Sequence, residues 1–222
     1  MNVNVRIGAQ VPRRGGALSR WLGRTVLRLL GWRIEGEVPD HPKMVLIGVP
    51  HTSNMDGVIG LSTLVALGLD ATTMIKDSAF RGPLGWLLRT LGAIPINRRS
   101  PKGVVEQSIE AFQQRPQLLM LIAAEGTRHS ATGFKRGFYH IARGAGVPVL
   151  AATVHYRERA VRFGPLMWPS GDFESDIPPF LDFWKHQGWP QHPGRLSKPL
   201  CEVMGLPYQG TDRAPPPGKK AQ

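Results

Sequence analysis

Short apolar runs alternate with longer, mixed stretches along the middle of the chain. Runs of five or six apolar residues are typical of buried strands, and the stretches between them have the length of helices. The expected strands are residues 44–49, 71–75, 93–96, 118–123, 149–154 and 161–163. The expected helices are residues 53–69, 84–91, 101–114 and 134–144. This alternation predicts an α/β fold: a single layered domain over residues 33–208 whose largely parallel central sheet is flanked by helices.

Residues 17–32 have a different pattern. Arg20, Arg24 and Arg28 recur every four residues on one stripe, and apolar residues, tryptophans among them, cover much of the remaining circumference. A basic amphipathic helix of this kind is typical of an element that lies on a membrane surface. The pattern also fits a terminal helix that packs on the domain's own core and leaves its arginines in solvent.

The two ends of the chain carry weaker signals. Residues 1–16 are mostly polar and are expected to be a disordered N-terminus, and residues 209–222, with three consecutive prolines and paired lysines, a disordered tail. The longest nearly apolar stretch, residues 58–69, falls short of the ~20 residues that cross a bilayer. No transmembrane helix is expected.

Composition narrows the class of protein. The 222 residues carry a formal net charge of +12, which points to an anionic partner such as a phospholipid surface, a nucleic acid or a phosphorylated substrate. A nucleic acid is the least expected of these, since the basic residues are dispersed and no binding motif is present. The single cysteine, Cys201, excludes an internal disulfide framework and suits a reducing compartment.

The most informative motif is His51 followed five residues later by Asp56, at the junction of an expected strand and an expected helix. Ser53 fits an N-cap, with Asp56 three residues on in the capping-box position. His51 then lies in the preceding turn, where its ring can fold back towards the carboxylate. A carboxylate on one ring nitrogen leaves the other free to take a proton. Taken alone, the same residues are also consistent with a simple helix cap and a polar turn.

Further along, Arg98 ends the run from Gly92, and residues 125–128 read Glu-Gly-Thr-Arg directly after an expected strand. Because the carboxyl ends of parallel strands share one edge of a sheet, His51 and Glu125 are expected on the same edge. Guanidinium groups bind carboxylate or phosphate oxygens in pairs. A base, its carboxylate and arginines for an anionic substrate together indicate a transferase site.

In this order, the motifs resemble the PlsC-type glycerolipid acyltransferase family. The matching blocks, which span roughly residues 44 to 155, are His51-Thr-Ser-Asn-Met-Asp56, Gly92-Ala-Ile-Pro-Ile-Asn-Arg98, Glu125-Gly126-Thr127-Arg128 and Val147-Pro-Val-Leu150. Lys76 and the run from Phe134 to Gly137 also stand where the family commonly has a lysine and an F-K-x-G run. Pro50, Pro95 and Asn97 depart from the family pattern without removing a group that the chemistry requires.

The resemblance implies an enzyme of the 1-acylglycerol-3-phosphate acyltransferase type. Such an enzyme moves a fatty acyl group from acyl-CoA or acyl-carrier-protein to a lysophospholipid hydroxyl. His51 would be the general base and Asp56 its orienting partner, with the oxyanion stabilised by backbone N–H groups near the following helix. Arg98 would hold the acceptor phosphate, with Arg128 and Lys76 as further candidates. Glu125, Gly126 and Thr127 would form a tight turn at the strand end, within the substrate-binding site, with Glu125 either ordering that turn or anchoring an arginine.

No metal or other cofactor is expected beyond the acyl-donor substrate, since the histidines lack metal-ligand spacing. The expected partners are a lysophospholipid acceptor, an acyl thioester donor and an anionic membrane surface. The expected location is peripheral, on the cytoplasmic face of the cell membrane. Two alternatives stay open: the same chemistry on a lyso-aminolipid or glycolipid acceptor, and a non-enzymatic nucleic-acid-binding protein.

Overall fold

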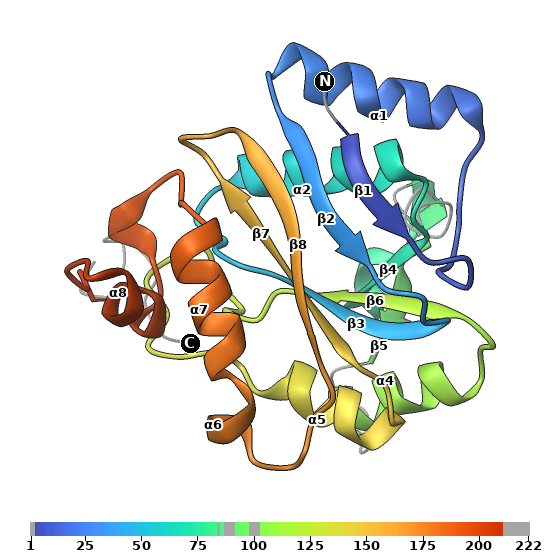
Figure 1. Cartoon of the computed structure of the whole chain (residues 1–222). Helices are drawn as coiled ribbons and strands as arrows, with labels where there is room; N and C mark the ends of the chain where they lie inside the picture. Colours follow the sequence, from blue (N-terminus) through green and yellow to red (C-terminus); the bar gives the residue numbers. More distant parts are fainter. Residues whose placement is uncertain (1–2, 84, 87–91, 98–102, 211–222) are drawn as a thin grey trace.

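The computed structural model describes residues 3–210 apart from 84, 87–91 and 98–102 (Figure 1). Over these residues the chain forms an eight-stranded sheet in the order β1-β2-β8-β7-β3-β6-β4-β5. The strands are β1 (Val3–Ile7), β2 (Arg33–Val38), β3 (Lys43–Gly48), β4 (Ala71–Lys76), β5 (Ile94–Ile96), β6 (Leu118–Ile122), β7 (Val149–His155) and β8 (Ala160–Met167). All neighbours pair in parallel except β7 and β8. The expected α/β fold with a largely parallel sheet is confirmed.

Helices cover both faces of this sheet (Figure 1). They are α1 (Ala17–Leu29), α2 (Asn54–Leu67), α4 (Val104–Gln113), α5 (Gly137–Ala145), α6 (Phe173–Asp176), α7 (Pro178–Gln187) and α8 (Lys198–Met204), with short 3-10 turns at η1 (Asp77–Ala79) and η2 (Pro193–Arg195). One core forms between the sheet and α1 and α2, through Leu27 and Ile59. The other forms under α4, α5 and α7, through Phe112, Phe138 and Trp184.

Strand β3 lies at the centre and has four buried residues in succession, Met44 to Ile47. A continuous apolar run is what a strand needs when helices cover both of its faces. Because β3 runs parallel to β6 and β7, the carboxyl ends of the three strands meet at one edge of the sheet. The residues that follow these strands therefore lie close together at this edge; they are His51, Glu125 and Tyr156.

The N-terminal segment contradicts the expectation of disorder over residues 1–16. Residues Val3–Ile7 form β1, which pairs in parallel with β2, and Val11 is buried at 1% exposure. The expectation missed β1 and its neighbour β2 because their apolar positions alternate with charged or polar ones and form no continuous run. Pairing with the rest of the sheet is what orders them.

A helix, α1, forms within the expected range 17–32, but it ends at Leu29, before Gly31 with its positive φ. It crosses α2 closely at Gly23, where an added Cβ would lie 2.5 Å from the backbone N of Ala66. Arg24 and Arg28 are exposed on this helix, and so are several large apolar side chains. The exposed apolar side chains are Leu18, Trp21, Leu22, Val26 and Leu29.

Two of the three arginines of α1 also donate hydrogen bonds to backbone carbonyls. Arg24 donates to the carbonyl of Ala66 at the end of α2, and Arg20 donates to the carbonyl of Gly15. Helix α2 also exposes apolar side chains, Val58 and Leu61 among them. Together α1 and α2 leave an apolar surface in contact with solvent. Among the described residues, none of the helices has both the length and the apolar character that crossing a membrane requires.

The remaining boundaries follow from local signals. The helix expected over 53–69 is α2, which ends where Gly68 adopts the left-handed conformation. The helix expected over 101–114 is observed from Val104, and residues 98–102 lie outside the described residues. Most of the helix expected over 84–91, and all but two residues of the expected tail, also lie outside them.

Candidate active site

The loop from β3 to α2 brings His51 and Asp56 together. Ser53 is the N-cap of α2 and forms the expected capping box with Asp56: the Ser53 hydroxyl accepts from the Asp56 N–H, and the Asp56 carboxylate accepts from the Ser53 N–H. The His51 ring folds back over this turn, and its Nδ1 lies 3.3 Å from Oδ2 of Asp56. The expected contact is confirmed. Within the described part of the chain, the other ring nitrogen has no recorded partner.

Asp56 is held from several sides. Its Oδ2 accepts the backbone N–H of Thr52 at 2.6 Å and of Ser53 at 2.8 Å, and its Oδ1 accepts the Ser53 hydroxyl at 3.0 Å. Its side chain is only 5% exposed. Burial by itself would raise the pKa of Asp56. The hydrogen bonds from His51, Tyr156 and these backbone groups outweigh burial and hold the pKa below its usual range.

Tyr156 is a site residue that the sequence analysis missed. It follows β7, the parallel neighbour of β3, and its hydroxyl donates to Oδ1 of Asp56 at 2.5 Å. Burial, together with this hydrogen bond to Asp56, raises the pKa of the Tyr156 hydroxyl. The available signal was its place directly after an expected strand, the same signal that drew attention to His51 and Glu125.

Glu125 supports the histidine loop. Its Oε2 accepts the backbone N–H of His51 at 2.6 Å, across 74 residues of chain, and the residue is 2% exposed. Burial raises the pKa of the Glu125 carboxyl, against the effect of the His51 N–H. Glu125 thus contacts the backbone of the loop that carries His51, and its place beside a substrate stays a prediction. The shared edge predicted for His51 and Glu125 is confirmed.

The rest of the Glu-Gly-Thr-Arg turn lies beside the start of α2. Gly126 has a φ of +66°. Glycine adopts this left-handed conformation readily because it has no Cβ, so it suits this position of the turn. The Thr127 hydroxyl accepts the N–H of His129. Arg128 is exposed, and its guanidinium donates to the side chain of Asn54 in the first turn of α2. One cation thus stands close to the His51 loop.

The two other expected cations are less well defined. Arg98 lies outside the described residues. Lys76 is the last residue of β4, where its backbone pairs with Ile96 of β5. Strand β5 thus runs in parallel beside β4, and its carboxyl end lies at the same edge of the sheet as that of β4.

A segment near the C-terminus also closes on this loop, and the sequence analysis assigned it no role. The N–H of His192 donates to the Thr52 hydroxyl, and Arg195 donates to the Thr52 carbonyl. The Ser130 N–H donates to the carbonyl of Arg195, which ties the same segment to the turn after Glu125. Residues 192–195 therefore join the two loops of the site from outside the region in which the motifs were found.

A cavity of about 440 Å³ opens beside His51 and Asp56, between α2 and the sheet. Apart from these two residues its walls are mostly apolar side chains and glycines, among them Leu46, Leu121 and Phe163. Its size lies in the range of small-molecule sites. A base and its carboxylate at an apolar cavity suit a reaction on a molecule with a long apolar portion.

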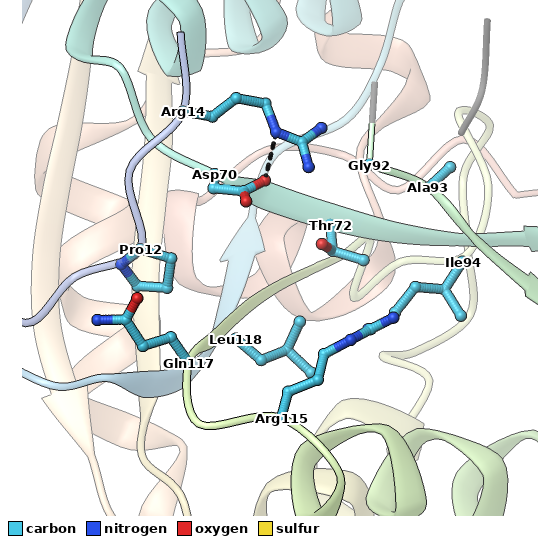
Figure 2. A pocket seen from close by; sticks show the side chains of 10 residues that line it. All are labelled: Pro12, Arg14, Asp70, Thr72, Gly92, Ala93, Ile94, Arg115, Gln117 and Leu118. Carbon is cyan, nitrogen blue, oxygen red and sulfur yellow. Dashed lines mark ion pairs between the residues drawn. The ribbon is translucent and has the colours of Figure 1, made fainter. Parts of the chain in front are cut away.

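A second cavity, of about 280 Å³, lies at the amino ends of β4 and β6 and has a different character. Figure 2 shows Arg14 and Asp70 paired at its upper side, with Thr72 between this pair and Arg115. None of its lining residues is a histidine or cysteine. Across the described part of the chain, no group of three or more potential metal ligands is present.

Comparison with known proteins gives a family match. The family model described as "Acyltransferase" matches residues 32–155, more than half of the chain. A 1-acyl-sn-glycerol-3-phosphate acyltransferase from Haemophilus influenzae is 27% identical over 177 residues, which cover 75% of this chain and 70% of that protein. The chloroplastic 1-acyl-sn-glycerol-3-phosphate acyltransferase BAT2 of Brassica napus is 30% identical over 112 residues, 47% of this chain and about a third (32%) of that protein.

Among solved structures, PlsC from Thermotoga maritima, titled a 1-acyl-sn-glycerophosphate acyltransferase, has a similar fold. The TM-score is 0.54 at 16% sequence identity, and the match covers 74% of each chain. At this identity the likeness concerns the fold alone. It agrees with the mostly parallel, helix-flanked sheet described above.

Proposed function

Because the chain belongs to the acyltransferase family, we propose that it transfers a fatty acyl group from acyl-CoA or acyl-carrier-protein to the free hydroxyl of a lysophospholipid, with 1-acylglycerol-3-phosphate as the first acceptor to test. The observation that carries the proposal is the contact between His51 and Asp56 at the wall of a largely apolar cavity. Two relatives named for this acceptor support the choice.

The proposed reaction is a direct transfer. The free nitrogen of His51 takes the proton of the acceptor hydroxyl while the oxygen attacks the thioester carbonyl. The carbon–sulfur bond then breaks, and the leaving thiolate takes the proton back from the imidazolium. Asp56 stays ionised throughout and stabilises the imidazolium. Backbone N–H groups at the start of α2 are the proposed donors to the oxyanion, since a helix N-terminus favours negative charge.

The acyl chain would occupy the 440 Å³ cavity. Its apolar walls favour a hydrocarbon chain at about 25 cal/mol per Å² of buried apolar surface. The acceptor phosphate would bind at the cations beside the same loop. Arg128, held by Asn54, is the described candidate, and Arg98 and Lys76 stay predictions. Gly57 follows Asp56 and also lines the cavity. Because it has no side chain, it would leave room for the thioester to approach.

We further propose that the apolar surface of α1 and α2 lies on the cytoplasmic face of a membrane, as a peripheral attachment. The exposed Trp21, Leu22 and Leu61 support a lipid contact, because exposed apolar surface of this extent marks an interaction site. The net charge of +12 adds attraction to anionic lipid. Of the two alternatives left open for α1, its exposed apolar side chains favour the membrane.

The test is acyl transfer by the purified chain to a panel of acceptors in mixed micelles: lysophosphatidic acid, a lyso-aminolipid and a lyso-glycolipid, each with acyl-CoA and with acyl-carrier-protein. We expect the highest kcat/KM with lysophosphatidic acid. Replacing His51 with Ala should lower kcat by about 10²–10⁴-fold, the usual contribution of a general base. A higher kcat/KM with another acceptor would identify that acceptor as the substrate within the same family. Retained turnover in the His51 variant would refute the mechanism.

A further inference from the structure

The carboxylate of Asp56 divides its partners between its two oxygens. Oδ2 faces the His51 ring and the backbone N–H groups of Thr52 and Ser53. Oδ1 faces two hydroxyls, those of Ser53 at 3.0 Å and Tyr156 at 2.5 Å. Ser53 and the backbone groups belong to the same turn as Asp56. Among the residues that the structure describes, Tyr156 is the one that hydrogen-bonds to the carboxylate from another part of the sheet, 100 residues away.

The Tyr156 ring is itself held in place. It packs edge to face against Trp32, with ring centroids 5.0 Å apart and planes at 87°. Trp32 is buried at 5% exposure and precedes β2. A phenol fixed in this way presents its hydroxyl in one direction, so the hydrogen bond to Asp56 costs little further ordering.

We propose that Tyr156 is a positioning residue for the base. Its hydroxyl anchors Oδ1 of Asp56, keeps Oδ2 aimed at the His51 ring, and withdraws part of the negative charge that the ring would otherwise feel. The proposal rests on the role of His51 given under the proposed function. Tyr156 touches no reacting atom in this account and acts only through Asp56.

The charged and titratable groups around the pair do not duplicate this role. Glu125 contacts the backbone of His51 rather than its ring, Arg195 contacts the carbonyl of Thr52, and Arg128 contacts the side chain of Asn54. His192 approaches the Thr52 hydroxyl through its backbone N–H. Among the described residues, only the partners listed above contact the Asp56 carboxylate.

The direction of the effect follows from electrostatics. A donor to a carboxylate stabilises the ionised form and weakens its hold on a neighbouring cation. Without the Tyr156 hydroxyl, Asp56 retains more charge to share with a protonated His51. The protonated ring then persists to higher pH, and the less firmly oriented carboxylate supports the imidazolium less well in the transition state, which lowers kcat.

The experiment is Tyr156→Phe, followed by NMR titration of the His51 ring in the protein without substrate and by the pH profile of acyl transfer. The His51 signal is identified as the one that disappears in His51→Ala. We expect its titration midpoint, and the acidic limb of kcat/KM, to move up by about 0.5–1 pH unit, and kcat at the optimum to fall about tenfold with KM for both substrates unchanged.

Tyr139→Phe is the matched control. The Tyr139 hydroxyl also donates to a carboxylate, Oδ2 of Asp176 at 2.6 Å, but in the α5–α6 region. This variant should leave the His51 midpoint where it is. An unmoved midpoint in Tyr156→Phe, or equal shifts in both variants, would overturn the proposal.

Two further outcomes keep the test decisive. If Tyr156→Phe fails to fold, 3,5-difluorotyrosine placed at position 156 keeps the ring and strengthens the donor, so the midpoint should move down instead, and no movement refutes the proposal. Because the titration needs no substrate, a shifted midpoint in a protein that shows no acyl transfer would support the role of Tyr156 while refuting the proposed function.

Discussion

The two ends of helix α2 each carry an aspartate beside a cavity, and the two aspartates differ in how they are held. Asp56 in the first turn is 5% exposed in its side chain and accepts hydrogen bonds from two backbone N–H groups and two hydroxyls, with His51 beside it. Asp70, just after the helix, is 30% exposed and forms an ion pair with Arg14 at 2.9 Å (Figure 2).

The different partners of the two aspartates indicate different roles for the two ends of α2. At the first end, converging donors fix both the orientation and the charge of a carboxylate, which is the preorganisation that catalysis requires. At the second end, Arg13 donates to the carbonyl of Leu67 and Arg24 to that of Ala66, so cations meet the helix C-terminus and attach the N-terminal segment to the domain. The first end thus has the organisation that the proposed mechanism needs, and the other end attaches the N-terminal segment.

The largest expected effect comes from exchanging each aspartate for asparagine. Asp56→Asn removes the charge that stabilises the imidazolium and should lower kcat about 10²–10⁴-fold, whereas Asp70→Asn should change kcat less than about twofold. Initial rates of acyl transfer by the two purified variants, compared at matched circular dichroism, check this. Similar losses in both variants would remove the distinction between the two ends.

The next effect concerns the crossing of α1 over α2. At Gly23 a Cβ would lie 2.5 Å from the N of Ala66 and 2.8 Å from the O of Ser62, so Gly23→Ala should destabilise the protein by about 1–3 kcal/mol. At Gly60, in the middle of α2, nothing lies within 4 Å, and Gly60→Ala should stabilise by about 0.5–1 kcal/mol. Urea unfolding gives both values, and equal signs would contradict the close crossing.

A smaller effect is expected from the cap of α2. Ser53→Ala removes the hydroxyl that accepts the Asp56 N–H and donates to its Oδ1, and should cost about 1 kcal/mol of stability together with part of the activity. Ser62→Ala, in the interior of the same helix, serves as the control and should be nearly neutral. A cap variant as active and as stable as the control would show that Tyr156 and the backbone suffice to hold Asp56.

The pH dependence of stability should report how strongly the charge of Asp56 is stabilised. The folded pKa of Asp56 is depressed, so its contribution is fully present above the unfolded pKa, ~3.9, and is lost as pH falls through the lower folded pKa. The free energy of unfolding of the native protein should therefore fall more steeply than that of Asp56→Asn below about pH 4. Parallel curves would mean that the donors around Asp56 do not stabilise its charge.

The smallest effect is that of the Arg14–Asp70 pair on stability. Both side chains are about a third exposed or more, at 40% and 30%, so a double-mutant cycle with Arg14→Gln and Asp70→Asn should give about 0–1 kcal/mol, falling with added salt. A coupling energy well above that range, or one that salt leaves unchanged, would mean that this end of the helix is held as tightly as the other.

Much of the fold was predictable from apolar runs. The central strands β3, β6 and β7 were expected within one residue or two, because burial on both faces demands continuous apolar sequence. The edge strand β1 and its neighbour β2 were missed, because Arg6, Glu35 and Glu37 interrupt their apolar positions. Such strands are ordered by pairing with a neighbour, which no local pattern records.

The sequence by itself determined whatever depends on near neighbours. The capping box of Ser53 and Asp56, and the fold of the His51 ring over it, involve residues within five positions of one another, so their spacing was enough to predict them. Only the tertiary structure decided that Tyr156 reaches Asp56 and that Glu125 holds the His51 backbone, across 100 and 74 residues. These contacts depend on strand order and register, which are set when β3, β6 and β7 pack together and not by the residues beside each group.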